Sequence, residues 1–138
     1  MDPVVHFEMP AKDRARAKKF YESVFGWTMT QLGEDMGNYL LAQTTPTDQK
    51  TTRPIEPGAI NGGFFDYNEK DPGFQYPSVT IAVQDLQKAM KEVEKAGGKV
   101  IGGRNPGEPD DIPGVGLFIA IVDSEGNRVS LLQPSMST

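Results

Sequence analysis

The sequence predicts an α+β fold of two βαβββ modules within a single domain, residues 1–138, and two observations indicate it. A strand pattern, a capped helix pattern and three further strand patterns occur twice, in the same order. A shift of 72 residues lays His6 on Ser78 and Asp13 on Asp85, so the elements also keep their spacing. A ferredoxin-like βαββαβ arrangement would leave two strands after the first helix, where three are predicted. We therefore expect module one at about residues 1–66 and module two at about residues 77–135.

The stretch VVHFEMP, residues 4–10, is the first predicted strand. Successive side chains of a strand point to opposite faces, so apolar and polar residues separate here. His6, the only histidine of the chain, shares its face with Glu8. An imidazole and a carboxylate two residues apart are a natural beginning for a metal site or an acid/base site. The apolar face holds Val5, Phe7 and Met9.

An amphipathic helix is expected between Asp13 and Gly26. Apolar residues recur there at the spacing of one helix face, and charged residues occupy the other. Asp13 suits the N-cap, and Gly26 suits the left-handed residue just past the end. Strands are then predicted at residues 28–32, 39–43 and 59–65, with a polar surface loop over residues 44–57. The apolar stripe of the helix comprises Ala17, Phe20, Tyr21, Val24 and Phe25.

The second module repeats this pattern. SVTIAV, residues 78–83, alternates as a strand, and a helix follows that Asp85 caps and Gly97 ends. Further strands are predicted at residues 99–102, 116–122 and 128–133, and the DSEGN segment before the last is a hairpin turn signal. The apolar stripe of this helix comprises Leu86, Ala89, Met90 and Val93.

Composition argues against several functions. Fourteen Lys and Arg against nineteen Asp and Glu give a net charge of -5, and no basic stripe is present, so we expect no nucleic-acid partner. No apolar run approaches membrane-spanning length, so we expect no membrane partner. The lack of cysteine excludes disulfides and thiolate metal ligands. No cationic and apolar leader follows Met1, which favours a cytoplasmic location.

Three segments together resemble one known family: VVHFEMP with RAKKFYESVFGW, then VTIAVQDLQKAMKEVEKAGGKV, then IPGVGLFIAIVDSEGNRVSLLQP. The chain is similar to the vicinal oxygen chelate superfamily of glyoxalases, bleomycin-resistance proteins and extradiol dioxygenases, and most of all to its small glyoxalase-like members. The resemblance implies curved mixed sheets around a cavity, with the helices on the convex side, and often a homodimer. The first apolar strand face would then pack on the first helix, and Val79, Ile81 and Val83 on the second. The residues that would face the cavity are His6, Glu8, Ser78 and Thr80.

The resemblance also implies where a metal would bind. Metal-dependent members carry histidine or glutamate ligands on the first and last strand of each module, and the ion acts as a Lewis acid. Here His6 matches one such position, but Ser78 and Ser130 match two others. The fourth lies within residues 58–65, which contain no acid, histidine or glutamine. Since tight sites need three or more protein ligands, we expect no catalytic metal, with a weakly held divalent ion on His6 and Glu8 as the alternative.

Other side chains, Ser130 among them, are expected to line the cavity. Tyr39 and Phe64 lie on predicted strands, although aromatic residues there are more often part of the core. Arg104 begins a loop, residues 104–116, that covers the cavity in many relatives. In an alternative without chemistry, His6 is hydrogen-bonded in a polar wall and Glu8 pairs with Arg104 or another cation.

These observations favour a protein of the glyoxalase/bleomycin-resistance type that binds a small organic molecule without a catalytic metal. The alternative is a glyoxalase-like lyase or isomerase that uses His6 and Glu8 as catalytic acid/base groups, or a weakly held metal. An interaction module with a vestigial cavity is a third possibility.

Overall fold

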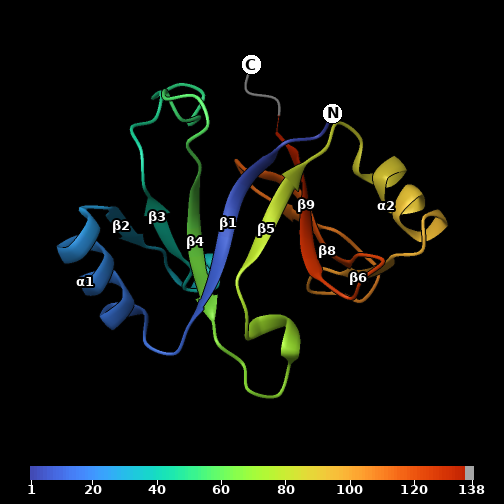
Figure 1. The fold of residues 1–138 in the computed structure, drawn as a ribbon, viewed down its shortest axis with the longest axis horizontal. Helices are drawn as coiled ribbons and strands as arrows, with labels where there is room; N and C mark the ends of the chain where they lie inside the picture. Colours follow the sequence, from blue (N-terminus) through green and yellow to red (C-terminus); the bar gives the residue numbers. More distant parts are fainter. Residues whose placement is uncertain (136–138) are drawn as a thin grey trace. The chain divides into compact units, whose positions relative to one another are not determined.

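A computed structural model gives the structure of the chain and describes residues 1–135 (Figure 1). The chain divides into two compact units. The first unit comprises residues 6–77, and the second comprises residues 1–5 together with the segment from Ser78 onward. Each unit contains one α-helix and a sheet; the first follows the predicted βαβββ order, and the second follows it with one additional short strand, β7 (Asp110–Ile112). The expected α+β fold is confirmed.

The first unit forms a four-stranded sheet in the order β2-β3-β4-β1. Strands β2 and β4 each pair antiparallel with β3, and β1 pairs parallel with β4. Two short 3-10 helices, η1 (Glu34–Met36) and η2 (Pro72–Phe74), lie in its connections. The main elements are β1 (Val4–Ala11), α1 (Arg14–Phe25), β2 (Thr28–Gln31), β3 (Leu40–Gln43) and β4 (Asn61–Asp66).

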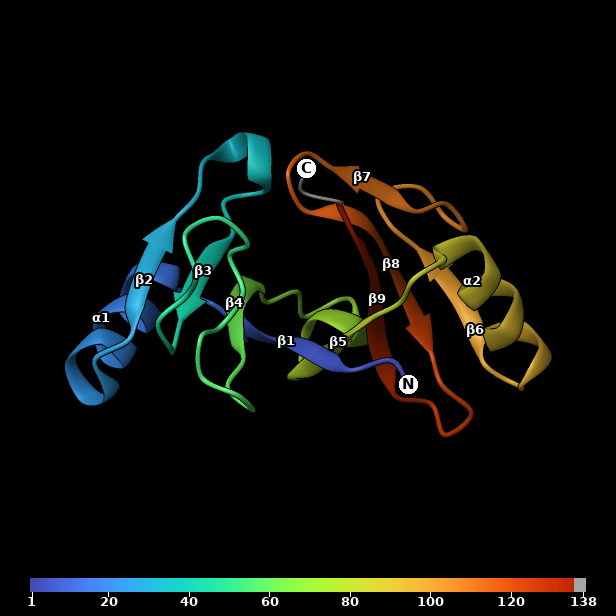
Figure 2. The ribbon, with the colours of Figure 1, turned by 90° about the horizontal axis from the view of Figure 1, so that it is seen from above.

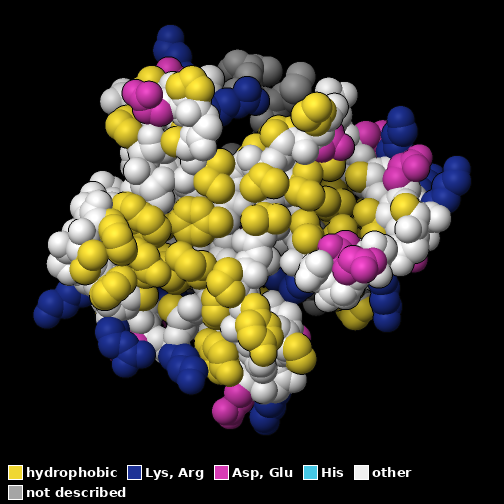
Figure 3. All heavy atoms as spheres, viewed as in Figure 1, with side chains coloured by type: hydrophobic (Ala, Val, Ile, Leu, Met, Phe, Trp, Pro, Cys, Tyr) yellow, Lys and Arg dark blue, Asp and Glu magenta, His cyan; other side chains and the backbone are white. Residues whose placement is uncertain are grey.

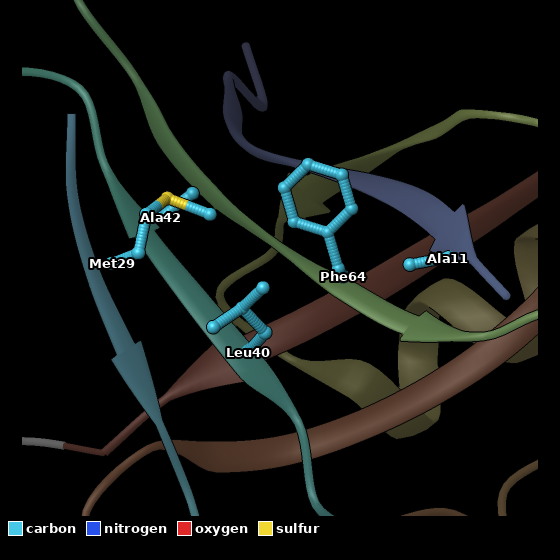
Figure 4. Close-up of a cluster of buried hydrophobic side chains, with 5 residues drawn as sticks. All are labelled: Ala11, Met29, Leu40, Ala42 and Phe64. Atoms are coloured by element: carbon cyan, nitrogen blue, oxygen red, sulfur yellow. The ribbon is translucent and has the colours of Figure 1, made fainter. Parts of the chain in front are cut away.

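The core of the first unit lies between α1 and one face of this sheet. The helix begins where the Asp13 side chain accepts a hydrogen bond from the Arg16 backbone and ends at Gly26, which adopts φ 70°. Phe7 and Met9 pack into the core, as their parity predicts. Figure 4 shows the buried cluster, which comprises Ala11, Met29, Leu40, Ala42 and Phe64.

The predicted apolar stripe of α1 is wrong in part. Phe20, Val24 and Phe25 are 51%, 56% and 58% exposed, and no residue of α1 is buried. Ala17 and Tyr21, one turn apart, are the stripe residues that reach the core. A helix touches a sheet along a narrow line, so the other stripe residues lie on its flanks. Apolar side chains consequently gather at the surface over α1 (Figure 3).

The second unit repeats the topology of the first. Its sheet has the order β5-β9-β8-β6, with β5 parallel to β9, β8 antiparallel to β9 and β6 antiparallel to β8. A short strand that the sequence did not predict, β7, pairs with β8 from residues expected to form a loop. The elements are β5 (Ser78–Ala82), α2 (Leu86–Lys95), β6 (Lys99–Gly102), β7 (Asp110–Ile112), β8 (Gly116–Val122) and β9 (Arg128–Pro134).

Helix α2 packs against β6, β8 and β9, and it lies along β6 in Figure 2. Ile81 and Val83 pack under it as predicted. Val79 is 38% exposed and lies outside this core, and Val5 belongs to neither core cluster, so both predictions were wrong. For Val79 the reason is that α2 begins at Leu86, after β5, so the core includes Ile81 and Val83, the residues nearest that start.

Hydrogen bonds confirm the predicted cap of the second helix and the predicted hairpin turn. Asp85 accepts from the Lys88 backbone at the start of α2, and the Asp123 and Asn127 backbones close the hairpin between β8 and β9. None of the helices within residues 1–135 combines the length and apolar character needed to cross a bilayer.

Candidate functional site

His6, Tyr39 and Glu8 form a hydrogen-bonded cluster in the first unit. Phe7, Met9 and Ala11 of β1 pack into the core beneath α1, so His6 and Glu8 lie on the opposite face of the sheet. The Tyr39 hydroxyl is 3.0 Å from His6 Nε2 and donates to Glu8 Oε2 at 3.2 Å. Tyr39, expected only to line a cavity, thus lies between the two proposed catalytic residues.

Gly63 makes this cluster possible. Tyr39 immediately precedes β3, which is two strands from β1, and adjacent strands are about 4.8 Å apart. The tyrosine ring therefore has to pass over β4 to reach Glu8. Gly63 lies in register with Glu8 on one side and with Leu41 on the other, and a Cβ there would overlap the Tyr39 ring and hydroxyl. A residue without a side chain is required at this point.

Burial controls the protonation of the cluster. Burial lowers the pKa of His6 to about 4, so its imidazole is neutral at pH 7. The pKa of Tyr39 is raised, first by burial and then by the charge and the hydrogen bond of Glu8. The Glu8 side chain is itself buried. At neutral pH the imidazole and the phenol are both uncharged.

The corresponding face of the second unit carries hydroxyl groups. Thr80 on β5 lies in register with Ser130 on β9, and both are buried on the sheet face opposite α2. The Ser78 and Thr80 hydroxyl oxygens are buried without a hydrogen-bond partner among residues 1–135. The three hydroxyl-bearing residues predicted to line a cavity therefore share one sheet face, and their contact with a ligand stays a prediction.

Two predicted cavity residues lie elsewhere. Phe64 is 3% exposed and belongs to the core, with its ring 5.2 Å from the ring of Tyr21, so its cavity-lining prediction is wrong. Its register with Met9 puts it on the helix-facing side of β4. Arg104 is exposed in the connection between β6 and β7, where its backbone donates to Asp110 Oδ1. Its role toward a ligand stays a prediction.

The residues present do not fit a tightly held divalent metal. The 72-residue shift lays Glu8 on Thr80. Gly63 is the register partner of Glu8, and Ser130 is the register partner of Thr80, so Gly63 and Ser130 are counterparts. The four positions then hold one imidazole, two hydroxyls and a glycine. No group of three or more His, Cys, Asp or Glu side chains that could hold a metal occurs in the described part of the chain.

The bridge through Tyr39 was missed at the sequence level. The glycine pair in INGGFF was a signal, since glycine inside a strand often marks the close approach of another group. The sequence does not say which group approaches, because this depends on strand order and register.

Comparison with known proteins agrees with this architecture. The model of the Glyoxalase/Bleomycin resistance protein/Dioxygenase superfamily matches residues 4–131. The methylmalonyl-CoA epimerase of Mycobacterium tuberculosis is 14% identical, with a TM-score of 0.64 over 96% of this chain and 88% of that one. The Streptomyces coelicolor methylmalonyl-CoA epimerase in complex with 2-nitronate-propionyl-CoA is 14% identical, with a TM-score of 0.66 over 96% and 97%.

A hypothetical protein of Bacillus halodurans C-125 is 12% identical, with a TM-score of 0.66 over 99% of this chain and 97% of that one. At such identities these structures share the fold alone. No curated protein matches the sequence. On the family match over nearly its whole length, the chain belongs to the glyoxalase/bleomycin resistance protein/dioxygenase superfamily.

Proposed function

We propose that this protein binds a small organic molecule on the polar sheet face of its first unit, and that it does so without a catalytic metal. The observation that carries the proposal is the hydrogen-bonded bridge from His6 through Tyr39 to Glu8. This bridge holds polar groups in fixed positions on the sheet side opposite the core. A few fixed polar groups are a common feature of small-molecule sites.

The protonation of the cluster favours binding over acid/base catalysis. A general acid or base works best when its pKa lies near the operating pH. The pKa of His6, lowered to about 4, makes the imidazole a weak base, and the raised pKa of Tyr39 makes the phenol a weak acid. Groups of this kind are better suited to holding hydrogen bonds than to moving protons.

The cluster also disfavours metal binding at this position. His6 Nε2 and Glu8 Oε2 are both within hydrogen-bond distance of the Tyr39 hydroxyl. An ion bound by these two atoms would have to displace that hydroxyl and would still have two protein ligands, fewer than stable sites use.

An isomerase or lyase is the second candidate function. The observation in its favour is that several solved structures of the same fold are methylmalonyl-CoA epimerases. In such an enzyme His6 and Glu8 would act as acid/base groups or would hold a divalent ion weakly. A homodimer, a cytoplasmic location and module boundaries near residues 66 and 77 are further proposals, the first of which sedimentation velocity tests directly.

A thermal-shift screen of a small-molecule library tests the proposal. We expect some compounds to raise the melting temperature of the wild type and to lose that effect in Tyr39→Phe, which lacks only the bridging hydroxyl. Tyr76→Phe is the matched control, because the same change is made at a residue that is 67% exposed. A screen without stabilising compounds would contradict the binding function.

Elemental analysis tests the metal-dependent form of the second candidate. Protein purified without added metal should contain no stoichiometric ion, and nickel, zinc or manganese should leave its melting temperature unchanged. A near-stoichiometric ion that disappears in His6→Ala would favour the enzyme instead.

A further inference from the structure

The hydrogen bonds of the cluster determine the tautomer of His6. The single hydroxyl hydrogen of Tyr39 is donated to Glu8 Oε2. The Tyr39 oxygen, 3.0 Å from His6 Nε2, must then accept a hydrogen bond from that nitrogen. His6 Nε2 therefore carries the ring proton.

The other ring nitrogen is consequently an acceptor. A neutral imidazole has one N–H group, so Nδ1 retains its lone pair. The low pKa of His6 keeps the ring neutral at physiological pH. Within residues 1–135 the contact with Tyr39 is the single hydrogen bond of the His6 side chain, which leaves Nδ1 available to a ligand.

We infer that the ligand binds at His6 through a hydrogen-bond donor, a hydroxyl or an amide N–H, and that carboxylates are rejected at this position. The inference rests on the proposed function and specifies its ligand class. A carboxylate would place acceptor lone pairs against the acceptor Nδ1, close to a strand that also carries the Glu8 carboxylate. A neutral donor instead completes a series of hydrogen bonds: the ligand donates to Nδ1, Nε2 donates to Tyr39, and Tyr39 donates to Glu8.

Tyr39 is the positioning residue in this scheme. Without its hydroxyl, Nε2 has no fixed acceptor, and the two neutral tautomers of His6 become closer in population. Nδ1 would then donate as well as accept, and the selection between donors and carboxylates would weaken. Gly63 contributes indirectly, because it leaves the space that the Tyr39 ring occupies.

The single histidine makes the tautomer directly measurable, because every imidazole nitrogen signal belongs to His6. Long-range 1H–15N correlation spectra of the uniformly labelled full chain at pH 7 should show Nε2 protonated and Nδ1 unprotonated. The two nitrogen signals should move toward each other in Tyr39→Phe and stay unchanged in Tyr76→Phe. A protonated Nδ1 in the wild type, which needs no variant to fold, would overturn the inference.

Three small probes test the ligand class at matched ionic strength: propionamide, isopropanol and sodium propionate. The first two should shift the Nδ1 signal in a saturable way, whereas propionate should not. An equal shift with propionate, or no shift with either donor, overturns the inference. The failure of the binding function and the failure of the tautomer inference can be told apart. A thermal-shift screen that finds no ligand contradicts the binding function and leaves the tautomer result intact. If library compounds bind but Nδ1 is protonated, the tautomer inference alone is refuted.

Discussion

Replacing Gly63 by alanine tests the packing of the candidate site most directly. The new Cβ would occupy the place of the Tyr39 ring, so the ring must move and its hydroxyl must leave His6 and Glu8. Breaking a hydrogen bond between buried polar side chains costs about 1–3 kcal/mol, and overpacking costs about 1–3 kcal/mol. The better strand propensity of alanine returns about 0.5–1 kcal/mol. We expect the free energy of unfolding to fall by about 3 kcal/mol.

Urea denaturation measures this change, and a double-mutant cycle assigns its cause. If the clash with Tyr39 is responsible, Gly63→Ala should cost at least about 1 kcal/mol less in a Tyr39→Ala background than in the wild type. Costs that simply add in the double variant would refute the packing explanation. So would a Gly63→Ala protein within about 0.5 kcal/mol of the wild type, with unchanged His6 nitrogen signals.

Three further predictions concern stability. The pKa of His6 is lower in the folded protein than in the unfolded chain, so the unfolded chain binds the proton first as the pH falls from about 6.5 to 4. Over this range the free energy of unfolding should fall by about 3 kcal/mol relative to that of His6→Gln, as measured by parallel urea titrations. Thr80→Val removes a buried hydroxyl that lacks a partner in residues 1–135, so it should raise the free energy of unfolding by about 1 kcal/mol, and a lower melting temperature would contradict this. Leu40→Ala should cost about 2–5 kcal/mol, whereas Phe25→Ala, at a 58% exposed side chain, should cost less than about 1 kcal/mol by chemical denaturation.

Local patterns were sufficient for the elements and their order. Helix caps at Asp13 and Asp85 and the hairpin turn before β9 are interactions between residues close in sequence, so residue type predicts them well. Strand alternation likewise put His6 and Glu8 on one face and Phe7 on the other. These predictions need no knowledge of strand order.

Other features depend on which segments become neighbours. The strand β7 has the polar sequence DDI and is a strand because β8 offers an edge to pair with. Phe20 and Phe25 have the periodicity of buried residues, yet the sheet beneath α1 reaches only the side of the helix that carries Ala17 and Tyr21. Sequence periodicity describes a helix face and not the width of the surface that covers it.

The candidate site divides in the same way. Residue order alone is enough to put an imidazole and a carboxylate on one strand face and to put glycines in β4. That Tyr39 crosses Gly63 to join them follows from the folded arrangement of the strands. The physical reason is that this contact spans three strands, so it depends on their order, on their register and on the one position where the intervening strand has no side chain.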